Sequence, residues 1–258
     1  MQIFKGSGSL FLSLGLALTV IGASARGQGS AGVINTSHFE VQYGQGVPEA
    51  DARKVADFLQ KDYTHLSAAL GMEWKGALEV HVCESVGKFM TETGVPKPWR
   101  GAIYQRGILY TQPVQALVHR KIFERSLKYE LARAILDSAI ERGCPRWLVE
   151  AFAVHHSGEL ENLAPPIGAK LASFSDLDQD IQENPNPPQR DDVHYMLGQT
   201  MRFFVEKYGE KEAHGVFRLF DGNTGVEKVF KKAFKEDYAA SEKSWARFIS
   251  EHTSTFER

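Results

Sequence analysis

The sequence has few cysteines, no excess of one charge sign and only one long apolar run. Its 258 residues include only two cysteines, Cys83 and Cys144, and neither belongs to a CxxC pair. This pattern excludes zinc ribbons, haem attachment and thioredoxin-like redox chemistry. A disulfide between the two requires Cα atoms within about 7 Å of each other, and the sequence leaves that question open.

Charge and motif content exclude further classes of protein. The formal net charge is -2, and acidic and basic residues are mixed along the chain. Nucleic-acid binding, which needs clustered Lys and Arg, is therefore not expected. The densest basic segment has helical spacing and predicts a solvated helix face: Lys228, Lys231, Lys232 and Lys235. The chain lacks the G-x-S-x-G elbow, the P-loop and a G-x-G-x-x-G motif after a strand.

The one long apolar run, residues 10–21, follows Lys5 and precedes Ala23-Ser24-Ala25. This order is typical of a secretory signal, and it predicts cleavage after Ala25. The run is shorter than the roughly 20 residues that a bilayer-spanning helix needs. We therefore expect residues 1–25 to be removed and the mature protein to be periplasmic or secreted, without a membrane anchor. Residues 26–36 are rich in Gly, Ser and Ala and predict a flexible segment, with order beginning near His38.

The first half of the remaining chain has mainly strand signals. Residues 39–43 and 78–82 alternate apolar and polar side chains, and residues 102–104 and 108–110 predict two strands joined by a tight connection. Between the first two strands, apolar residues recur every three or four positions from Pro48 to Leu70. Gly71 stands where a helix C-cap is expected.

The second half has helical periodicity throughout. It predicts helices at residues 121–140, 146–156, 193–208, 210–220, 226–234 and 239–252, with an exposed Pro-rich loop at 183–190. We therefore expect an α+β fold: a small N-terminal mixed β-sheet lobe with a helix, then a mainly helical lobe. The domain covers residues 37–252, strand-rich over 37–120 and helical over 121–252.

Three segments carry a family resemblance. Residues 128–134 read Lys-Tyr-Glu-Leu-Ala-Arg-Ala, and residues 145–153 read Pro-Arg-Trp-Leu-Val-Glu-Ala-Phe-Ala. The third segment begins with His194-Tyr195-x-x-Gly198 and ends with Tyr208-Gly209. Over residues 37–250 the chain resembles the peptidase MA-like gluzincins, a group of zinc metallopeptidases. The resemblance implies a thermolysin-like zincin architecture, with the first segment at the position of the His-Glu-x-x-His zinc helix.

The sequence departs from that family at both zinc-binding histidines. In His-Glu-x-x-His, two imidazoles one helical turn apart bind one zinc ion, and the Glu faces the bound water as general base. Here Tyr129 and Arg133 occupy the two histidine positions. A phenol with an ordinary pKa near 10 is a poor zinc ligand, and a guanidinium group has no lone pair to donate. The degenerate helix therefore predicts no metal cofactor.

Both carboxylates of the motif are retained. By the resemblance, Glu130 matches the general base and Glu150 matches the third metal ligand. Two carboxylates brought together without a metal need another cation. We therefore predict that Arg133 bridges Glu130 and Glu150. The alternative is that Glu130 and Arg133 form an ordinary exposed pair on one helix face.

Other residues complete the candidate site. Trp147 and His194 are expected to line the cleft, and Tyr195 stands where the family has a late Tyr helix. Asp137, one turn beyond Arg133, is a nearby acid that could support a ligand. A relocated zinc site would have to draw on scattered histidines, namely His119, His155, His156 and His194.

Three functional hypotheses follow. The first is a catalytically inactive pseudo-peptidase that uses the retained cleft to bind a peptide or a cell-envelope component, or that acts as a scaffold. The second is an active zinc peptidase with non-standard ligands, and the third is a purely structural interaction module. The sequence leaves the partner and the oligomeric state open.

Overall fold

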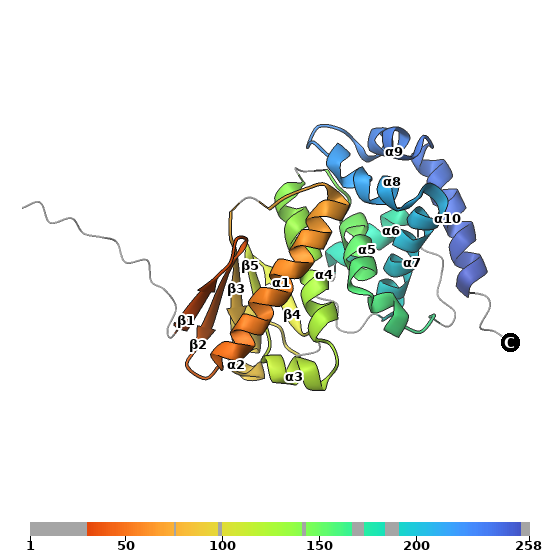
Figure 1. The fold of residues 1–258 in the computed structure, drawn as a ribbon. Helices are drawn as coiled ribbons and strands as arrows, with labels where there is room; N and C mark the ends of the chain where they lie inside the picture. The colour runs from red at the N-terminus through yellow and green to blue at the C-terminus, as the bar shows by residue number, and fades with distance from the viewer. Residues whose placement is uncertain are drawn as a thin grey trace, which may run out of the picture.

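In the computed structural model, the described residues are 30–74, 76–97, 100–140, 143–166, 173–183 and 191–253. They confirm the predicted α+β fold, because a small mixed sheet is followed by a mainly helical region (Figure 1). The predicted secretory signal, and all but the first residue of the predicted loop at 183–190, lie outside the described residues. Within these ranges, no helix is both long enough and apolar enough to cross a membrane.

The sheet has five strands in the order β1-β2-β3-β5-β4. β2 pairs in parallel with β3 and β3 with β5, whereas the outer pairs β1–β2 and β4–β5 are antiparallel. The alternating burial of β2 and β3 explains why their period-two patterns predicted strands. The strand bounds are β1 Ser30–Asn35, β2 Phe39–Gly44, β3 Leu78–Val82, β4 Ala102–Gln105 and β5 Ile108–Thr111.

The prediction of a flexible segment at residues 26–36 is wrong for its described part. Ser30–Asn35 form strand β1, so order begins before His38. Ile34 is buried and pairs with Val41 of β2. The backbone hydrogen bonds of an edge strand come from its neighbour, and the Gly- and Ser-rich composition does not reveal that neighbour.

Helix α1 (Glu49–Leu70) connects β2 to β3 and packs on the sheet (Figure 1). The predicted helix end is confirmed, because Gly71 caps α1 in the left-handed conformation with φ of 61°. Helix α2 (Val86–Thr93) starts at Ser85, whose hydroxyl accepts a hydrogen bond from the Lys88 backbone N–H at 3.0 Å. Both helices therefore start or end where the sequence supplies capping chemistry.

Helix α4 (Phe123–Ala139) lies between the sheet and the other helices (Figure 1). It contacts α1, β4 and β5 on one side and α5 (Arg146–Ser157) on the other. Its apolar residues Leu127, Leu131 and Ile135 are almost fully buried. Helix α3 (Val114–His119), which was not predicted, precedes α4, and the short 3-10 helix η1 (Glu159–Asn162) follows α5.

The remaining helices build an aromatic core around α5. Helix α6 (Phe174–Glu183) was not predicted, and the helix predicted at 210–220 is instead α8 (Glu210–Gly215) followed by the 3-10 helix η2 (Val216–Leu219).

The prediction of a solvated basic face is confirmed, since the four lysines of residues 228–235 are exposed. The other helices are α7 (Asp191–Tyr208), α9 (Val226–Phe234) and α10 (Tyr238–Thr253).

The two cysteines are free thiols, so the structure contains no bridge between them. Cys83 is buried at the end of β3, where its thiol donates a hydrogen bond to Glu92. Burial, and then the nearby Glu92 carboxylate, raise the pKa of the Cys83 thiol. A thiol held in its protonated form is a poor nucleophile, so Cys83 contributes to packing rather than to chemistry.

Candidate functional site

Tyr129, Glu130 and Arg133 lie on the part of α4 that faces α5 and the sheet. The Arg133 Nη1 atom lies 2.6 Å from Glu130 Oε2, and its Nε atom lies 3.0 Å from Glu150 Oε1 on α5. The predicted bridge between the two carboxylates is therefore confirmed. The exposed-pair alternative is wrong, because the Glu130 side chain is 1% exposed and that of Arg133 only 16%.

Arg100, just before β4, contributes a second cation that the sequence did not predict. Its Nη1 atom lies 3.2 Å from Glu130 Oε1, and its guanidinium group lies 5.0 Å from the centre of the Tyr129 ring. Gly101 allows this approach, because a Cβ atom there would lie 2.4 Å from Ser126 Oγ on α4. The segment before β4 can thus pack close enough to α4 to place Arg100 against Glu130.

Glu130 accepts hydrogen bonds from three donors. Besides the two guanidinium groups, the backbone N–H of Tyr104 on β4 donates to Glu130 Oε2 at 2.9 Å. Charge-assisted hydrogen bonds of this kind fix a buried carboxylate in position. Glu130 therefore ties helix α4 to the sheet.

Glu150 is held by the other half of the site. Its Oε2 atom accepts a short hydrogen bond from the Tyr129 hydroxyl, and Arg146 lies 3.8 Å from its Oε1 atom. Burial by itself would raise the pKa of Glu150, but Arg133, Arg100 and the Tyr129 hydroxyl together lower it. Burial, and then the Glu150 carboxylate, raise the pKa of Tyr129 well above its ordinary value, so the phenol stays protonated.

The network continues to His194 on α7 and Glu159 in η1. His194 Nε2 lies 3.5 Å from Arg100 Nη2, its Nδ1 atom lies 3.3 Å from Glu159 Oε1, and its ring stacks on Tyr129. Burial would raise the pKa of Glu159, but its hydrogen bond to His194 and the nearby charges lower it. We call the whole set the ion-pair cluster: Arg100, Tyr129, Glu130, Arg133, Glu150, Glu159 and His194.

Two of the other candidate residues lie in packed surroundings. Trp147 does not line a cleft: its indole is 1% exposed and stacks on Phe174 with ring centres 4.4 Å apart. The pattern that suggested a cleft residue marks an aromatic core position instead, because α6 supplies a partner that was not predicted. Tyr195 is buried, and its hydroxyl accepts a hydrogen bond from the Gln199 side chain at 2.8 Å.

Asp137 lies beside the cluster without joining it. Its Oδ2 atom accepts a hydrogen bond from the Tyr104 hydroxyl at 3.2 Å. Burial, and then the Asp137 charge, raise the pKa of Tyr104 to about 12. Asp137 therefore supports the strand residue whose backbone N–H holds Glu130.

The donor atoms of the cluster do not fit a zinc ion. Of the three positions that the sequence resemblance assigned to zinc ligands, only Glu150 offers a suitable oxygen. The Tyr129 phenol is protonated and donates its proton to Glu150, while Arg133 offers only N–H groups and a positive charge. A divalent cation between the carboxylates would meet both Arg100 and Arg133 at close range.

The histidines considered for a relocated site have different partners. His156 Nε2 lies 3.0 Å from Asp62 Oδ2, the His155 ring faces that of His214, and His119 is exposed at the end of α3. Within the described ranges, no three His, Cys, Asp or Glu side chains are grouped so that they could hold a metal ion.

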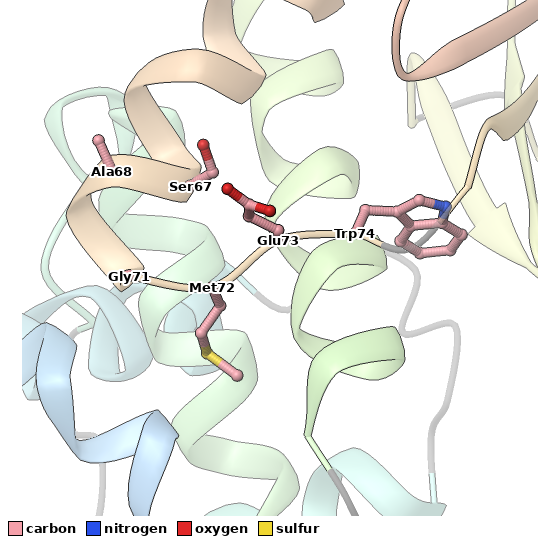
Figure 2. A pocket seen from close by; sticks show the side chains of 6 residues that line it. All are labelled: Ser67, Ala68, Gly71, Met72, Glu73 and Trp74. Carbon is pink, nitrogen blue, oxygen red and sulfur yellow. The ribbon is translucent and has the colours of Figure 1, made fainter.

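Two hollows lie near the cluster. One, with a volume of about 710 Å³, is formed by Ser67 and Ala68 of α1 and by the segment Gly71, Met72, Glu73 and Trp74 (Figure 2). Its Trp74 ring lies edge-on to Tyr104, with ring centres 6.4 Å apart, so this hollow adjoins the strand residue that anchors Glu130. Its lining is one short stretch of chain, with Glu73 as the only charged residue.

The other hollow, about 690 Å³ in volume, lies between α1, the start of α4 and the end of α5. We call it the basic hollow, because four of its lining side chains are cationic and two are acidic. Its η1 rim adjoins Glu159, the last member of the ion-pair cluster. The lining residues are Lys54, Phe58, Val118, Lys121, Phe123, Glu124, Arg125, Lys128, Ser157, Gly158, Glu161 and Asn162.

No family model matches the chain, and no curated protein matches it either. Among solved structures, it is similar to an M1 zinc metallopeptidase mutant bound to a Tyr-Ser-Ala substrate, from Deinococcus radiodurans. The TM-score is 0.44 and the sequence identity 14%, over 85% of this chain and 51% of the other. The chain thus spans about half the length of that structure.

Proposed function

We propose that this protein is an exported, non-catalytic relative of zinc metallopeptidases, in which an arginine replaces the metal. The single observation that carries the proposal is the position of Arg133 between Glu130 and Glu150, at 2.6 and 3.0 Å. A zinc ion at this place and the Arg133 guanidinium group are alternatives, because both need the Glu150 carboxylate.

The chemistry of the cluster opposes peptide hydrolysis. A general base needs a free oxygen within hydrogen-bond reach of the attacking water. Arg133, Arg100 and the Tyr104 backbone already take three of the roughly four acceptor sites of Glu130, so a water molecule would compete with fixed donors. A protonated Tyr129 phenol is a poor metal ligand and Arg133 has no lone pair to donate, so neither favours a metal that would activate water.

The cluster instead has the features of a cross-link between the two lobes. Arg100 and Tyr104 belong to the sheet lobe, Glu130 and Arg133 to α4, and Glu150 to α5. Three guanidinium groups, those of Arg100, Arg133 and Arg146, lie against the Glu130 and Glu150 carboxylates. We infer a scaffold or binding role, with a peptide or a cell-envelope component as the partner.

Metal content and peptidase activity test this proposal. We expect purified full-length protein, prepared without chelator and offered zinc, to retain less than one zinc per chain and to leave unstructured peptides uncleaved. One tightly bound zinc per chain, with proteolysis that a chelator abolishes, would show that the protein is an active peptidase with non-standard ligands.

Export is a separate part of the proposal, and residues 1–25 support it through their order of charge, apolar run and small residues. We expect the protein recovered from the cell envelope or medium to begin at Arg26 when its N-terminus is sequenced. Recovery of the uncleaved chain from the cytoplasm would contradict export while leaving the cluster argument intact.

A further inference from the structure

The basic hollow differs from the rest of the surface in its charge. The whole chain has a net charge of -2, whereas the lining of the hollow has Lys54, Lys121, Arg125 and Lys128 against only two acids, Glu124 and Glu161. Because like charges gathered around a concavity attract an opposite charge, this lining favours an anionic ligand.

The lining also has an apolar part. Phe58 and Phe123 lie edge-to-face with ring centres 5.4 Å apart, and Val118 is 41% exposed at the margin. The Lys54 ammonium group lies 4.9 Å from the centre of the Phe123 ring. A ligand that places an apolar side chain over Phe58 and its charges beside the cations would satisfy both parts of the lining.

Lys121 lies at a left-handed turn on the rim of the hollow. Lys121 has φ of 56°, a left-handed conformation that glycine adopts at lower cost. It turns the chain between α3 and α4, and its exposed side chain lines the hollow. Lys121 therefore adds a cation to the rim, and a glycine at this position would keep the turn.

Size and shape decide between classes of anionic ligand. A volume of about 690 Å³ is within the range of sites for small ligands or a few residues of peptide. Nucleic acid needs an extended cationic track, and this compact lining includes two carboxylates. A bilayer surface is not concave and would not fill the space over the two phenylalanines.

We propose that the basic hollow binds an acidic peptide segment that has an apolar side chain between its carboxylates. Glu124 and Glu161 restrict where the peptide can place those carboxylates, which adds selectivity. The lining of the hollow contains no residue of the ion-pair cluster, so peptide binding there does not depend on the non-catalytic role. Peptide binding and the zinc measurements have different readouts, so either proposal can fail without the other.

Fluorescence anisotropy with three labelled hexapeptides tests this assignment. The probes are Asp-Glu-Leu-Phe-Asp-Glu, its uncharged analogue Asn-Gln-Leu-Phe-Asn-Gln, and Asp-Glu-Ser-Gly-Asp-Glu, which lacks the apolar centre. We expect the first to bind at least tenfold more tightly than the other two, and more weakly as salt is raised. Equal affinity for all three would overturn the proposal.

The matched variants locate the site. Lys54→Gln with Lys121→Gly removes two cations from the hollow, and the glycine relieves the strained backbone, so the fold is preserved. The control is Lys61→Gln with Lys235→Gly, which makes the same changes on α1 and at another left-handed lysine, outside the hollow. We expect at least tenfold weaker binding for the first and less than a twofold change for the control.

Two further probes address the competing classes of ligand. A single-stranded DNA oligonucleotide and vesicles of anionic phospholipid are titrated under the same conditions. We expect both to bind more weakly than the acidic peptide. The assignment would be overturned if DNA or vesicles bound more tightly than the peptide and lost affinity in the Lys54 and Lys121 variant. It would also be overturned if the two double variants weakened peptide binding equally.

Discussion

Helices α4 and α7 each carry an Arg–Glu pair about one turn apart, and the two pairs lie in opposite surroundings. On α4, Arg133 lies 2.6 Å from Glu130, and their side chains are 16% and 1% exposed. On α7, Arg202 lies 2.7 Å from Glu206, and their side chains are 47% and 48% exposed. The two distances are nearly equal, so distance alone does not tell which pair holds the fold together.

The difference lies in what remains when one partner is removed. Around Arg202, water solvates whichever charge is left, and an exposed pair of this kind contributes at most about 1 kcal/mol. Around Arg133, the carboxylates of Glu130 and Glu150 would stay buried with too little positive charge. An unpaired buried charge costs several kcal/mol, so the α4 pair is essential even if its net contribution is small.

The largest expected effect is that of Arg133→Ala. We expect it to lower the free energy of unfolding by about 3–5 kcal/mol, the cost of breaking a buried ion pair. Arg202→Ala, the matched control on α7, should lower it by less than about 1 kcal/mol. Urea denaturation with unchanged m-values measures both. Equal losses for the two variants would mean that burial does not distinguish the pairs.

A smaller effect is expected from Tyr129→Phe, which removes only the hydroxyl that donates to Glu150. A hydrogen bond to a charged group contributes about 1.5–3 kcal/mol. Tyr195→Phe is the comparison, because its hydroxyl bonds the neutral Gln199 side chain and should contribute about 1 kcal/mol. Thermal or urea unfolding measures the loss of stability in each variant. A larger loss for Tyr195→Phe than for Tyr129→Phe would mean that the stronger hydrogen bond lies outside the cluster.

The smallest effect is a pH dependence that originates in Glu150. Its pKa is lower in the folded than in the unfolded protein, so its stabilisation is present above the unfolded pKa of about 4.3 and is lost as the pH falls. We expect the unfolding free energy of Glu150→Gln to vary less between pH 5 and 3 than that of the unsubstituted protein. Glu206→Gln, the exposed counterpart, should keep the steeper profile.

A contrast between local and tertiary contacts explains how far the sequence predicted the fold. Strands β2 and β3 and helices α1 and α9 were predicted within a residue or so, because each buries one face and its apolar spacing records that face. Strand β1 and helices α3 and α6 were missed. Strand β1 and helix α3 are short, and each depends on a neighbour that the sequence does not identify. Helix α6 was missed although Phe174, Leu177 and Ile181 recur at helical spacing and are buried.

The candidate site divides in the same way. Tyr129, Glu130 and Arg133 could be grouped from sequence because helical spacing places them on neighbouring faces within one turn. Arg100 and Glu159 could not, since they come from a loop and a 3-10 helix and join the cluster through tertiary packing. The basic hollow was hidden for the same reason. Lys54 and Lys121 are far apart in sequence, whereas the lysines of α9, which are close together, form only a solvated face.

The central claim, that Arg133 replaces a metal between Glu130 and Glu150, is tested most directly by restoring the histidines. The double variant Tyr129→His with Arg133→His places two imidazoles one turn apart beside Glu150. We predict that calorimetry will detect zinc binding to this variant, weaker binding when Glu150→Gln is added, and none to the unsubstituted protein. If the double variant binds no zinc, or binds it equally well without the Glu150 carboxylate, Arg133 does not occupy a former metal position.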